Sequence, residues 1–531
     1  MRRGHCLVAL LAGSTAFGQQ GLLPLSNTID APFTALMHRP EVAAHSAIRP
    51  YFREDLATLP GVDSLLHPAW KPLLQRITDP ARRLHFGPVV DALGGASLGE
   101  TSALKYRTGA GAWVGWNASP RWTLGIDAEG WAESLPNYLD SLVRASEVAP
   151  GEGFARRSGT GITHLDWRGY ADYKAGQYFH LTLGKGTNFF GEGFRSLLLS
   201  DEAYGYPYLR ITTTAWHFRY VNLFALMDDI RGAGGDPARF AKKFTSMHYL
   251  SWNISKRVNA GVFEAIVWQD NDPNYPRGFD LSYMNPVIFY RPVEFGLGSP
   301  DNALLGFALN VKAGKRTLLY AQVVLDEFLL GHVRAGDGWY GNKQGVQAGA
   351  VSHDAFGKKG LTLRAELNYV RPFMYTHMDT RQNYAHYNQP LAHPYGSGFM
   401  EMLAQGEWRK DRWVIGNVFS YALMGRDTAT TGTGSYGNNI FLPEVDRPQL
   451  PAGTLKRDFG YYLGEPLRSN VVQNEFRAGW LLEPRSGMLL ELAWTFRSET
   501  ADGLASLQTN YIRAGVSTNL HGRHPFQARR Y

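Results

Sequence analysis

Residues 371–394 gather histidine, tyrosine and amide side chains, which suit either metal binding or sugar binding. Imidazole and carboxylate groups are common metal ligands. The spacing of His377, Asp379, His386 and His393 matches no metal-binding pattern, so we expect no metal and no cofactor. Aromatic rings stack on the C–H faces of sugars and amides bind hydroxyl groups, so we expect carbohydrate contact, with ordinary loop packing as the alternative. The side chains concerned are Tyr384, His386, Tyr387, Asn388, Gln389 and His393.

A second segment, residues 188–201, mixes glycines with Glu192, Arg195 and Asp201. Charges that fold into a protein interior normally need partners. We therefore interpret this segment as a structural plug held by Glu192 and Arg195, with direct ligand contact as the alternative. The Gly-Lys-Ser/Thr element of a phosphate-binding loop is missing.

Three further charged residues complete the candidate glycan-binding set. Arg210 follows the second segment, and Arg291 and Glu294 lie in a third segment, residues 285–302. Such side chains suit anionic or neutral glycans.

Catalysis has little support. No Gly-x-Ser-x-Gly element occurs, and carboxylates such as Asp201 with Glu202, or Asp228 with Asp229, are adjacent in sequence. Neighbouring residues on a strand point to opposite faces, so such pairs do not converge. We expect no enzyme.

The composition narrows the class of protein. The 531 residues are 44% apolar and 13% aromatic with a net charge of +7, which excludes a disordered chain. The single cysteine excludes a disulfide scaffold and a cysteine-based metal site. Lys and Arg are spread along the chain, so nucleic acid is not an expected partner.

The N-terminus predicts export. Arg2 and Arg3 precede an apolar run at residues 6–12 and a small-x-small site at residues 16–18, so residues 1–18 are interpreted as a signal peptide. No later stretch of 18 apolar residues occurs, so no transmembrane helix is expected.

The hydrophobic period along residues 84–520 is two. Leu361, Leu363 and Leu367 share one face of residues 361–369, while Arg364 and Glu366 occupy the other. Segments of this kind predict about eighteen strands. They are 84–97, 104–117, 121–133, 161–174, 177–187, 207–217, 219–229, 243–255, 257–268, 302–313, 315–326, 343–355, 359–372, 395–409, 411–424, 472–483, 487–499 and 509–520.

The connections between these strands alternate between short and long, which is typical of an outer-membrane barrel. The predicted fold class is therefore all-β, a transmembrane antiparallel barrel with outer-membrane lipid as a partner. Tryptophans near the strand ends are expected to form an interfacial girdle: Trp122, Trp131, Trp167, Trp216, Trp408, Trp413 and Trp494.

The predicted domains are a periplasmic N-terminal extension of short helices at residues 19–83, packed under the barrel, and the barrel itself at residues 84–531. The extension lacks the alternation, and its prolines prevent a long helix. Whether residues 425–471 add a strand pair stays open.

Three loop motifs resemble the Wzi-like capsule-assembly family, most closely its Bacteroidetes branch, which includes the gliding-motility protein RemB. They are residues 188–201 with 206–210, 285–295 with 298–302, and 371–373 with 383–394. The resemblance extends over most of residues 84–520. It implies an outer-membrane barrel of eighteen strands with loops and short helices folded into the lumen, and a role in attaching or organising surface polysaccharide.

The favoured function is thus a barrel in the outer membrane of a Gram-negative cell that binds or organises surface polysaccharide. The alternative is a structural component of a gliding-motility or secretion complex, or a gated porin-like channel.

Overall fold

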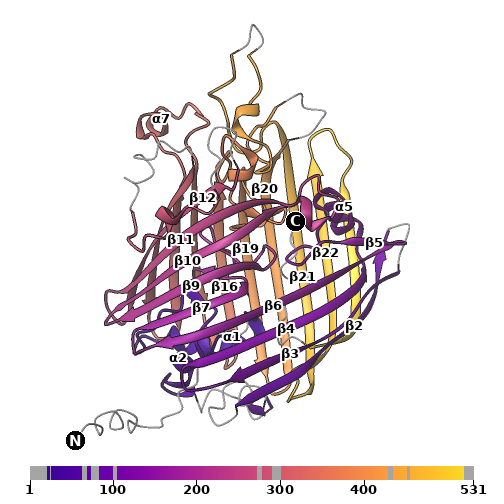
Figure 1. Ribbon diagram of the computed structural model, residues 1–531. Coiled ribbons are helices and arrows are strands. Elements are labelled where there is room, and N and C mark those ends of the chain that lie inside the picture. The colour runs from indigo at the N-terminus through magenta and orange to yellow at the C-terminus, as the bar shows by residue number, and fades with distance from the viewer. Residues whose placement is uncertain are drawn as a thin grey trace, which may run out of the picture.

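The computed structural model describes residues 21–23, 25–62, 69–72, 83–99, 104–271, 278–289, 301–427, 434–450 and 455–518. Within them, eighteen antiparallel strands form a closed barrel (Figure 1). The last strand pairs with the first from Asp91 opposite Ser517 to Leu98 opposite Asn510, so the sheet has no free edge. The strands are β2 (Leu84–Leu98), β3 (Leu104–Asn117), β4 (Trp122–Ser134), β6 (Gly161–Ala175), β7 (Phe179–Gly186), β9 (Tyr206–Ala215), β10 (Phe218–Asp229), β11 (Ala241–Asn253), β12 (Val258–Gln269), β13 (Asn302–Ala313), β14 (Thr317–Leu325), β15 (Gln344–Ser352), β16 (Leu361–Val370), β19 (Phe399–Lys410), β20 (Trp413–Arg426), β21 (Leu467–Glu483), β22 (Met488–Ala501) and β23 (Leu507–Thr518).

Short elements supplement the eighteen strands, and one of them, the strand at Arg156–Ser158, extends the barrel sheet by pairing with β6. The helices are α1 (Asn27–Met37), α2 (Arg53–Ala57), α5 (Asn137–Ser146) and α7 (Leu330–Ala335), with 3-10 turns η1 (Pro237–Arg239), η2 (Leu281–Met284), η3 (Ala355–Gly357), η4 (Thr380–Gln382) and η6 (Glu444–Asp446). The short strands are β1 (Ile48–Arg49), β5 (Arg156–Ser158), β8 (Phe189–Phe190), β17 (Ala385–His386) and β18 (Gln389–Pro390). Among the described residues, no helix has the length and apolar character needed to cross a bilayer.

The eighteen predicted strands are confirmed, each within a few residues of its expected bounds. The described parts of residues 427–466 contribute no further barrel strand, so the count stays at eighteen. One end of the barrel carries the short turns and the other carries the long connections; we call them the short-turn end and the long-loop end.

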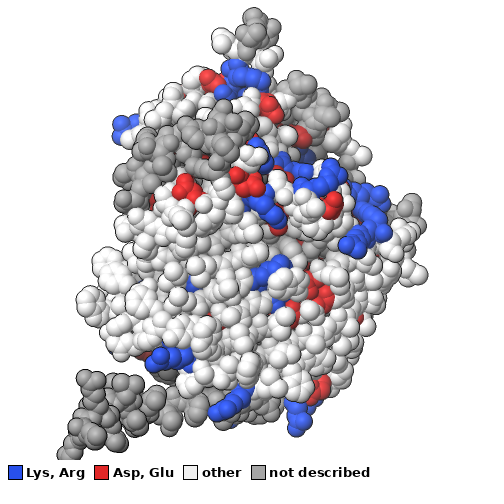
Figure 2. All heavy atoms as spheres, viewed as in Figure 1, with Lys and Arg blue, Asp and Glu red and all other residues white. Residues whose placement is uncertain are grey.

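The alternating pattern separates an apolar outer surface from a polar inner one. On β22, Leu490, Leu492 and Trp494 are exposed, while Glu491 and Thr495 are buried in the lumen. Figure 2 shows a broad uncharged area over the strands, with Lys and Arg concentrated nearer the long-loop end. An apolar band of this kind is what a bilayer requires of a barrel surface.

Six of the seven predicted girdle tryptophans are exposed on the outside, but the prediction for Trp131 is wrong. Trp131 is only 5% exposed and faces the lumen, where the Arg107 guanidinium carbon lies 4.1 Å from its ring centroid. The period of two explains this, because Trp131 lies on the same face of β4 as the buried Glu129 and Glu133.

The described N-terminal residues fill the short-turn end of the lumen, rather than packing under the barrel (Figure 1). Ile29, Phe33 and Met37 of α1 share a buried cluster with Trp113 and Leu489 of the wall. Helix α2 is held to the wall by an ion pair. Both carboxylate oxygens of its Asp55 accept hydrogen bonds from Arg219 of β10, at 2.6 and 3.0 Å. The apolar face of α1 is thereby removed from water by the barrel wall.

A second apolar cluster fills the lumen beside β9 to β16. We call residues 188–201 the plug segment. Its residues 197–199 pack there against Tyr249 and Phe263 of the wall and against Tyr384. Ile48 of the N-terminal region joins the same cluster, and β1 pairs with β8 of the plug segment. The barrel is therefore packed with protein on this side.

Candidate functional site

A cavity of about 900 Å³ opens at the long-loop end, and we call it the mouth cavity. Four parts of the chain form most of it: α5 with the turn after it, the end of the connection before β19, the loop after β20, and the ends of β22 and β23. Gly99 and Arg231, from two other connections, complete the lining. A cavity of this volume is in the range of known small-molecule sites.

Two arginines and a glutamate form one wall of the mouth cavity. Nη2 of Arg497 donates to Oε2 of Glu499 at 2.8 Å, and Arg426 pairs with the other oxygen of Glu499. The Nε atoms of Arg426 and Arg497 are buried and have no hydrogen-bond partner within the described chain. Both arginines line the cavity, and guanidinium groups donate hydrogen bonds to hydroxyl and carboxylate oxygens.

Amide groups line another part of the mouth cavity. Asn388 donates from Nδ2 to the carbonyl of Ser146 at 2.8 Å, and Asn438 donates from Nδ2 to Oδ1 of Asp427 at 3.0 Å. The Oδ1 atoms of Asn388 and Asn438 accept no hydrogen bond from the described residues. Burial raises the pKa of the Asp427 carboxyl above its usual range, although the hydrogen bond from Asn438 acts the other way. These oxygens can accept hydrogen bonds from hydroxyl groups.

Aromatic side chains complete the lining. Tyr138 of α5 lies 4.9 Å from the Arg497 guanidinium carbon, measured to its ring centroid, and Tyr395 and Phe441 also line the cavity. Aromatic faces, amide oxygens and guanidinium groups together match the chemistry of a sugar chain. Tyr395 adjoins residues 371–394 and belongs to the tyrosine-rich segment for which the sequence predicts carbohydrate contact, whereas Tyr138 and Phe441 were not predicted.

Of the predicted site residues, Asn388 and Gln389 line the mouth cavity. Oε1 of Gln389 accepts from the backbone N–H of Gly151 at 2.5 Å, and its Nε2 donates to the carbonyl of Glu152 at 3.3 Å. Gln389 thus fixes the loop after α5 beneath the cavity.

Four other predicted residues of the same segment pack within the protein. Tyr384 is buried, and its hydroxyl donates to the carbonyl of Leu198 at 2.8 Å. His393 is also buried, with its Nε2 atom 2.8 Å from Oε2 of Glu401. His386 accepts from the backbone N–H of Asp228 at 2.9 Å, and burial lowers its pKa well below the usual value, with neighbouring lysines acting in the same direction. Tyr387 is partly buried, with its ring centroid 4.8 Å from that of Tyr204.

The predicted residues of the second segment also contact protein. Glu192 receives a hydrogen bond from Ser46 at 2.5 Å and lies 3.1 Å from Nε2 of His38. Burial raises the pKa of Glu192, but the His38 and Ser46 hydrogen bonds outweigh it and bring the pKa below its usual value. Arg195 is buried and pairs with Glu202 at 2.8 Å and with Glu401 at 3.4 Å.

Arg210 is buried, too, and donates to Asn188 and Thr212 at 3.1 Å each, while Asp201 is partly buried in the plug segment. Arg291 and Glu294 lie outside the described residues. The structure therefore brings the predicted residues together around the plug more than around the mouth cavity.

Sequence reasoning missed Tyr138, Arg426, Arg497 and Asn438. A signal was present for Arg497, since it stands on the charged face of a strand that was recognised from its alternation. Nothing local marked Tyr138 or Asn438, because both lie in long connections.

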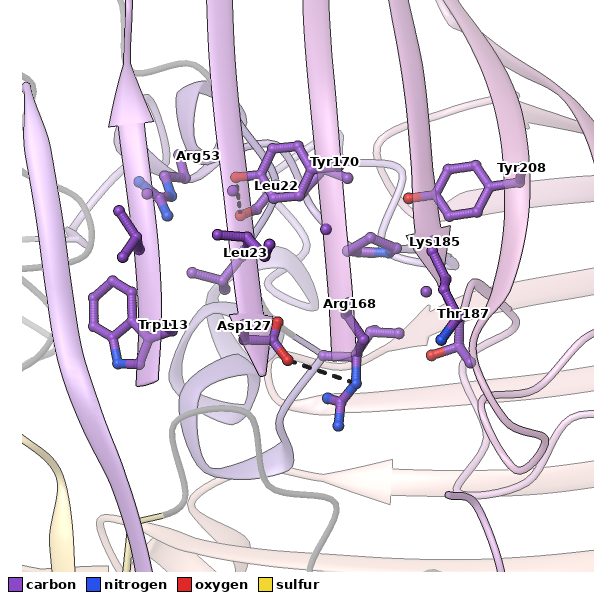
Figure 3. Close-up of a pocket in the computed structure, with 18 residues that line it drawn as sticks. Leu22, Leu23, Arg53, Trp113, Asp127, Arg168, Tyr170, Lys185, Thr187 and Tyr208 are labelled. Carbon is purple, nitrogen blue, oxygen red and sulfur yellow. Dashed lines mark hydrogen bonds and ion pairs between the residues drawn. The ribbon is translucent and has the colours of Figure 1, made fainter. Parts of the chain in front are cut away.

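A smaller cavity of about 100 Å³ lies at the other end, between the N-terminal region and the wall (Figure 3). Leu22, Leu23 and Arg53 face Asp127 and Arg168 across it, and Tyr170 donates to the carbonyl of Leu22 at 3.3 Å. Its volume suits a few water molecules rather than a sugar chain.

Comparisons with known proteins give a fold but no family. No protein-family model matches the sequence, and no curated protein matches it. Among solved structures, the chain is similar to Wzi, an Escherichia coli outer-membrane protein described as a carbohydrate-binding β-barrel involved in group 1 capsule assembly. The TM-score is 0.56 at 13% identity, covering 94% of this chain and 99% of Wzi. This likeness shows a shared barrel fold.

Two further matches are Pseudomonas aeruginosa outer-membrane proteins. OprD matches with a TM-score of 0.43 at 8% identity, covering 82% of this chain and 94% of OprD. OpdK matches with a TM-score of 0.43 at 9% identity, covering 82% of this chain and 98% of OpdK.

Proposed function

We propose that this protein is a Wzi-like outer-membrane barrel that binds surface polysaccharide in its mouth cavity. The observation that carries the proposal is the lining of that cavity, in which two arginines and two asparagines lie beside partly buried aromatic rings. A sugar chain offers hydroxyl groups, ring oxygens and C–H faces to these groups.

The fold supports the same proposal. Apolar clusters and N-terminal helices fill much of the barrel, so the described residues supply a ligand-sized space at the long-loop end rather than an open passage. In an outer-membrane barrel the long loops lie outside the cell, where capsule or exopolysaccharide would reach them. Residues 1–18 would then direct export, and residues 19–83 would form a plug entering from the periplasm.

The test is binding of extracted surface polysaccharide to the detergent-solubilised full-length protein. We expect the wild type to bind and the double variant Tyr138→Leu with Arg497→Gln to bind at least about tenfold more weakly. Arg121→Met is the matched control, because Arg121 is an exposed arginine in a short turn at the opposite end. Equal binding by the wild type and the double variant would overturn the proposed site.

A further inference from the structure

A buried cluster of two carboxylates and one imidazole lies beside the loop that follows α5. It consists of Glu133 on β4, Glu152 in that loop and His164 on β6. Nε2 of His164 lies 3.1 Å from Oε1 of Glu133 and 3.1 Å from Oε2 of Glu152. Two neighbouring strands and the connection between them thus bring one potential ligand atom each to within 4.8 Å of the others.

Arg107 contacts both carboxylates on the side away from His164. Its Nη1 donates to Oε2 of Glu133 at 2.9 Å, and its Nη2 donates to Oε1 of Glu152 at 2.9 Å. Nη1 also lies 3.4 Å from Oε2 of Glu152. The guanidinium therefore orients Glu133 through Oε2 and Glu152 mainly through Oε1, while Oε1 of Glu133 and Oε2 of Glu152 face His164. Outer groups that orient ligands in this manner are typical of metal sites.

The distances within the cluster fit a bound cation. Ligands of a tetrahedral ion at about 2.0–2.1 Å from the metal lie about 3.3 Å from one another. The His164 nitrogen lies 3.1 Å from each of the two carboxylate oxygens, which is close to the spacing of ligands around one such ion.

The charge of the cluster favours a cation as well. Asp91 lies beside Arg107 with Oδ2 at 3.8 Å from Nε, so three carboxylates share one guanidinium in this buried network. Buried charge is costly unless it is compensated. A divalent ion bound between Glu133 and Glu152 would add compensation for two of these buried carboxylates.

We propose that Glu133, Glu152 and His164 bind a divalent transition-metal ion, with Arg107 orienting the two carboxylates from outside. One imidazole with two carboxylates suits Zn²⁺ or Mn²⁺, whereas Ca²⁺ takes oxygen ligands alone. The ion joins the loop after α5 to the barrel wall. Because Gln389 hydrogen-bonds Gly151 and Glu152 of that loop, the ion also fixes the part of the chain beneath the mouth cavity.

The test is a Zn²⁺ titration of the chelator-treated, detergent-solubilised full-length protein, and it does not depend on the glycan proposal. We expect one Zn²⁺ per chain, with affinity at least about tenfold lower in His164→Gln and in Glu152→Gln. His393→Gln is the matched control, since His393 is equally buried and contacts Glu401 but lies outside the cluster. Heat-modifiable mobility in SDS gels verifies that each variant is folded.

Co²⁺ gives a second readout that needs no variant. Wild-type protein is expected to show the visible absorption bands of Co²⁺ held by nitrogen and oxygen ligands, and Zn²⁺ is expected to abolish them. A wild type that takes up no Zn²⁺ beyond the level of His164→Gln, or that gives no such bands, would overturn the metal site. The cluster would then be a buried network of side-chain contacts among Arg107, Glu133, Glu152 and His164.

Discussion

The Ser46 hydroxyl donates to Oε1 of Glu192 at 2.5 Å and joins two segments that are far apart in sequence. Ser46 belongs to the N-terminal region and Glu192 to the plug segment between β7 and β9. His38 contacts the other oxygen of Glu192 at 3.1 Å, and His353 contacts His38 at 2.9 Å. One carboxylate therefore connects both parts of the plug to the end of β15.

We expect Glu192→Gln to lower the free energy of unfolding by about 1.5–3 kcal/mol at neutral pH, because a buried charge-assisted network is lost. Thermal unfolding followed by heat-modifiable mobility measures this change. The exposed Glu41, in the same region, provides the control Glu41→Gln, for which no change is expected. Equal stability of wild type and Glu192→Gln would contradict a structural role for Glu192.

The same carboxyl gives a pH dependence. The folded-state pKa of Glu192 is below its ordinary value of 4.5, so its contribution is complete above that pH and is lost as the pH falls through the lower folded value. The stability difference between wild type and Glu192→Gln should therefore be constant from pH 7 to about 5 and should narrow in more acidic solution. A difference that instead narrows as the pH rises would contradict this assignment.

A variant of Tyr384 distinguishes a role in packing the plug segment from a role in sugar binding. Tyr384→Phe removes the hydrogen bond to the Leu198 carbonyl and leaves the ring, so we expect a loss of about 1 kcal/mol in stability. Polysaccharide binding should stay unchanged, because Tyr384 is buried away from the mouth cavity. Parallel unfolding and binding measurements on one preparation test both parts. Weaker polysaccharide binding by Tyr384→Phe, with unchanged stability, would contradict this assignment and would place Tyr384 in the binding site.

The packed lumen predicts the absence of a steady ion current. The two apolar clusters fill parts of the lumen between the wall and the segments folded into it, so we expect no aqueous path of porin width. Planar-bilayer recordings of the refolded protein should show no large steady conductance steps. Such steps would favour the gated-channel alternative.

The sequence predicted the barrel well because a strand in a barrel wall reads as a period of two, and that signal repeats eighteen times. Lumen contacts are different in kind. Whether His393 meets a sugar or Glu401 depends on how a long connection folds back onto β19, and no local pattern encodes that path. Trp131 is a different case, because its position in the alternation of β4 already indicated the lumen and only its residue type suggested the interface.

The mouth cavity was harder still to predict from sequence. Its wall combines the end of β22, α5 and the loop after β20, which are brought together only when the barrel closes. Arg497 and Tyr138 are separated by most of the chain, yet the guanidinium carbon of one lies 4.9 Å from the ring centroid of the other.

The most direct test of the central claim is the amount of cell-bound polysaccharide in a deletion strain complemented with wild type or with the Tyr138→Leu, Arg497→Gln double variant. We predict that the wild type restores cell-bound polysaccharide and that the double variant, inserted at equal level in the outer membrane, fails to restore it. Full restoration by the double variant would contradict the account. Unchanged polysaccharide in the deletion strain together with lost surface spreading would do the same, and would favour a motility component.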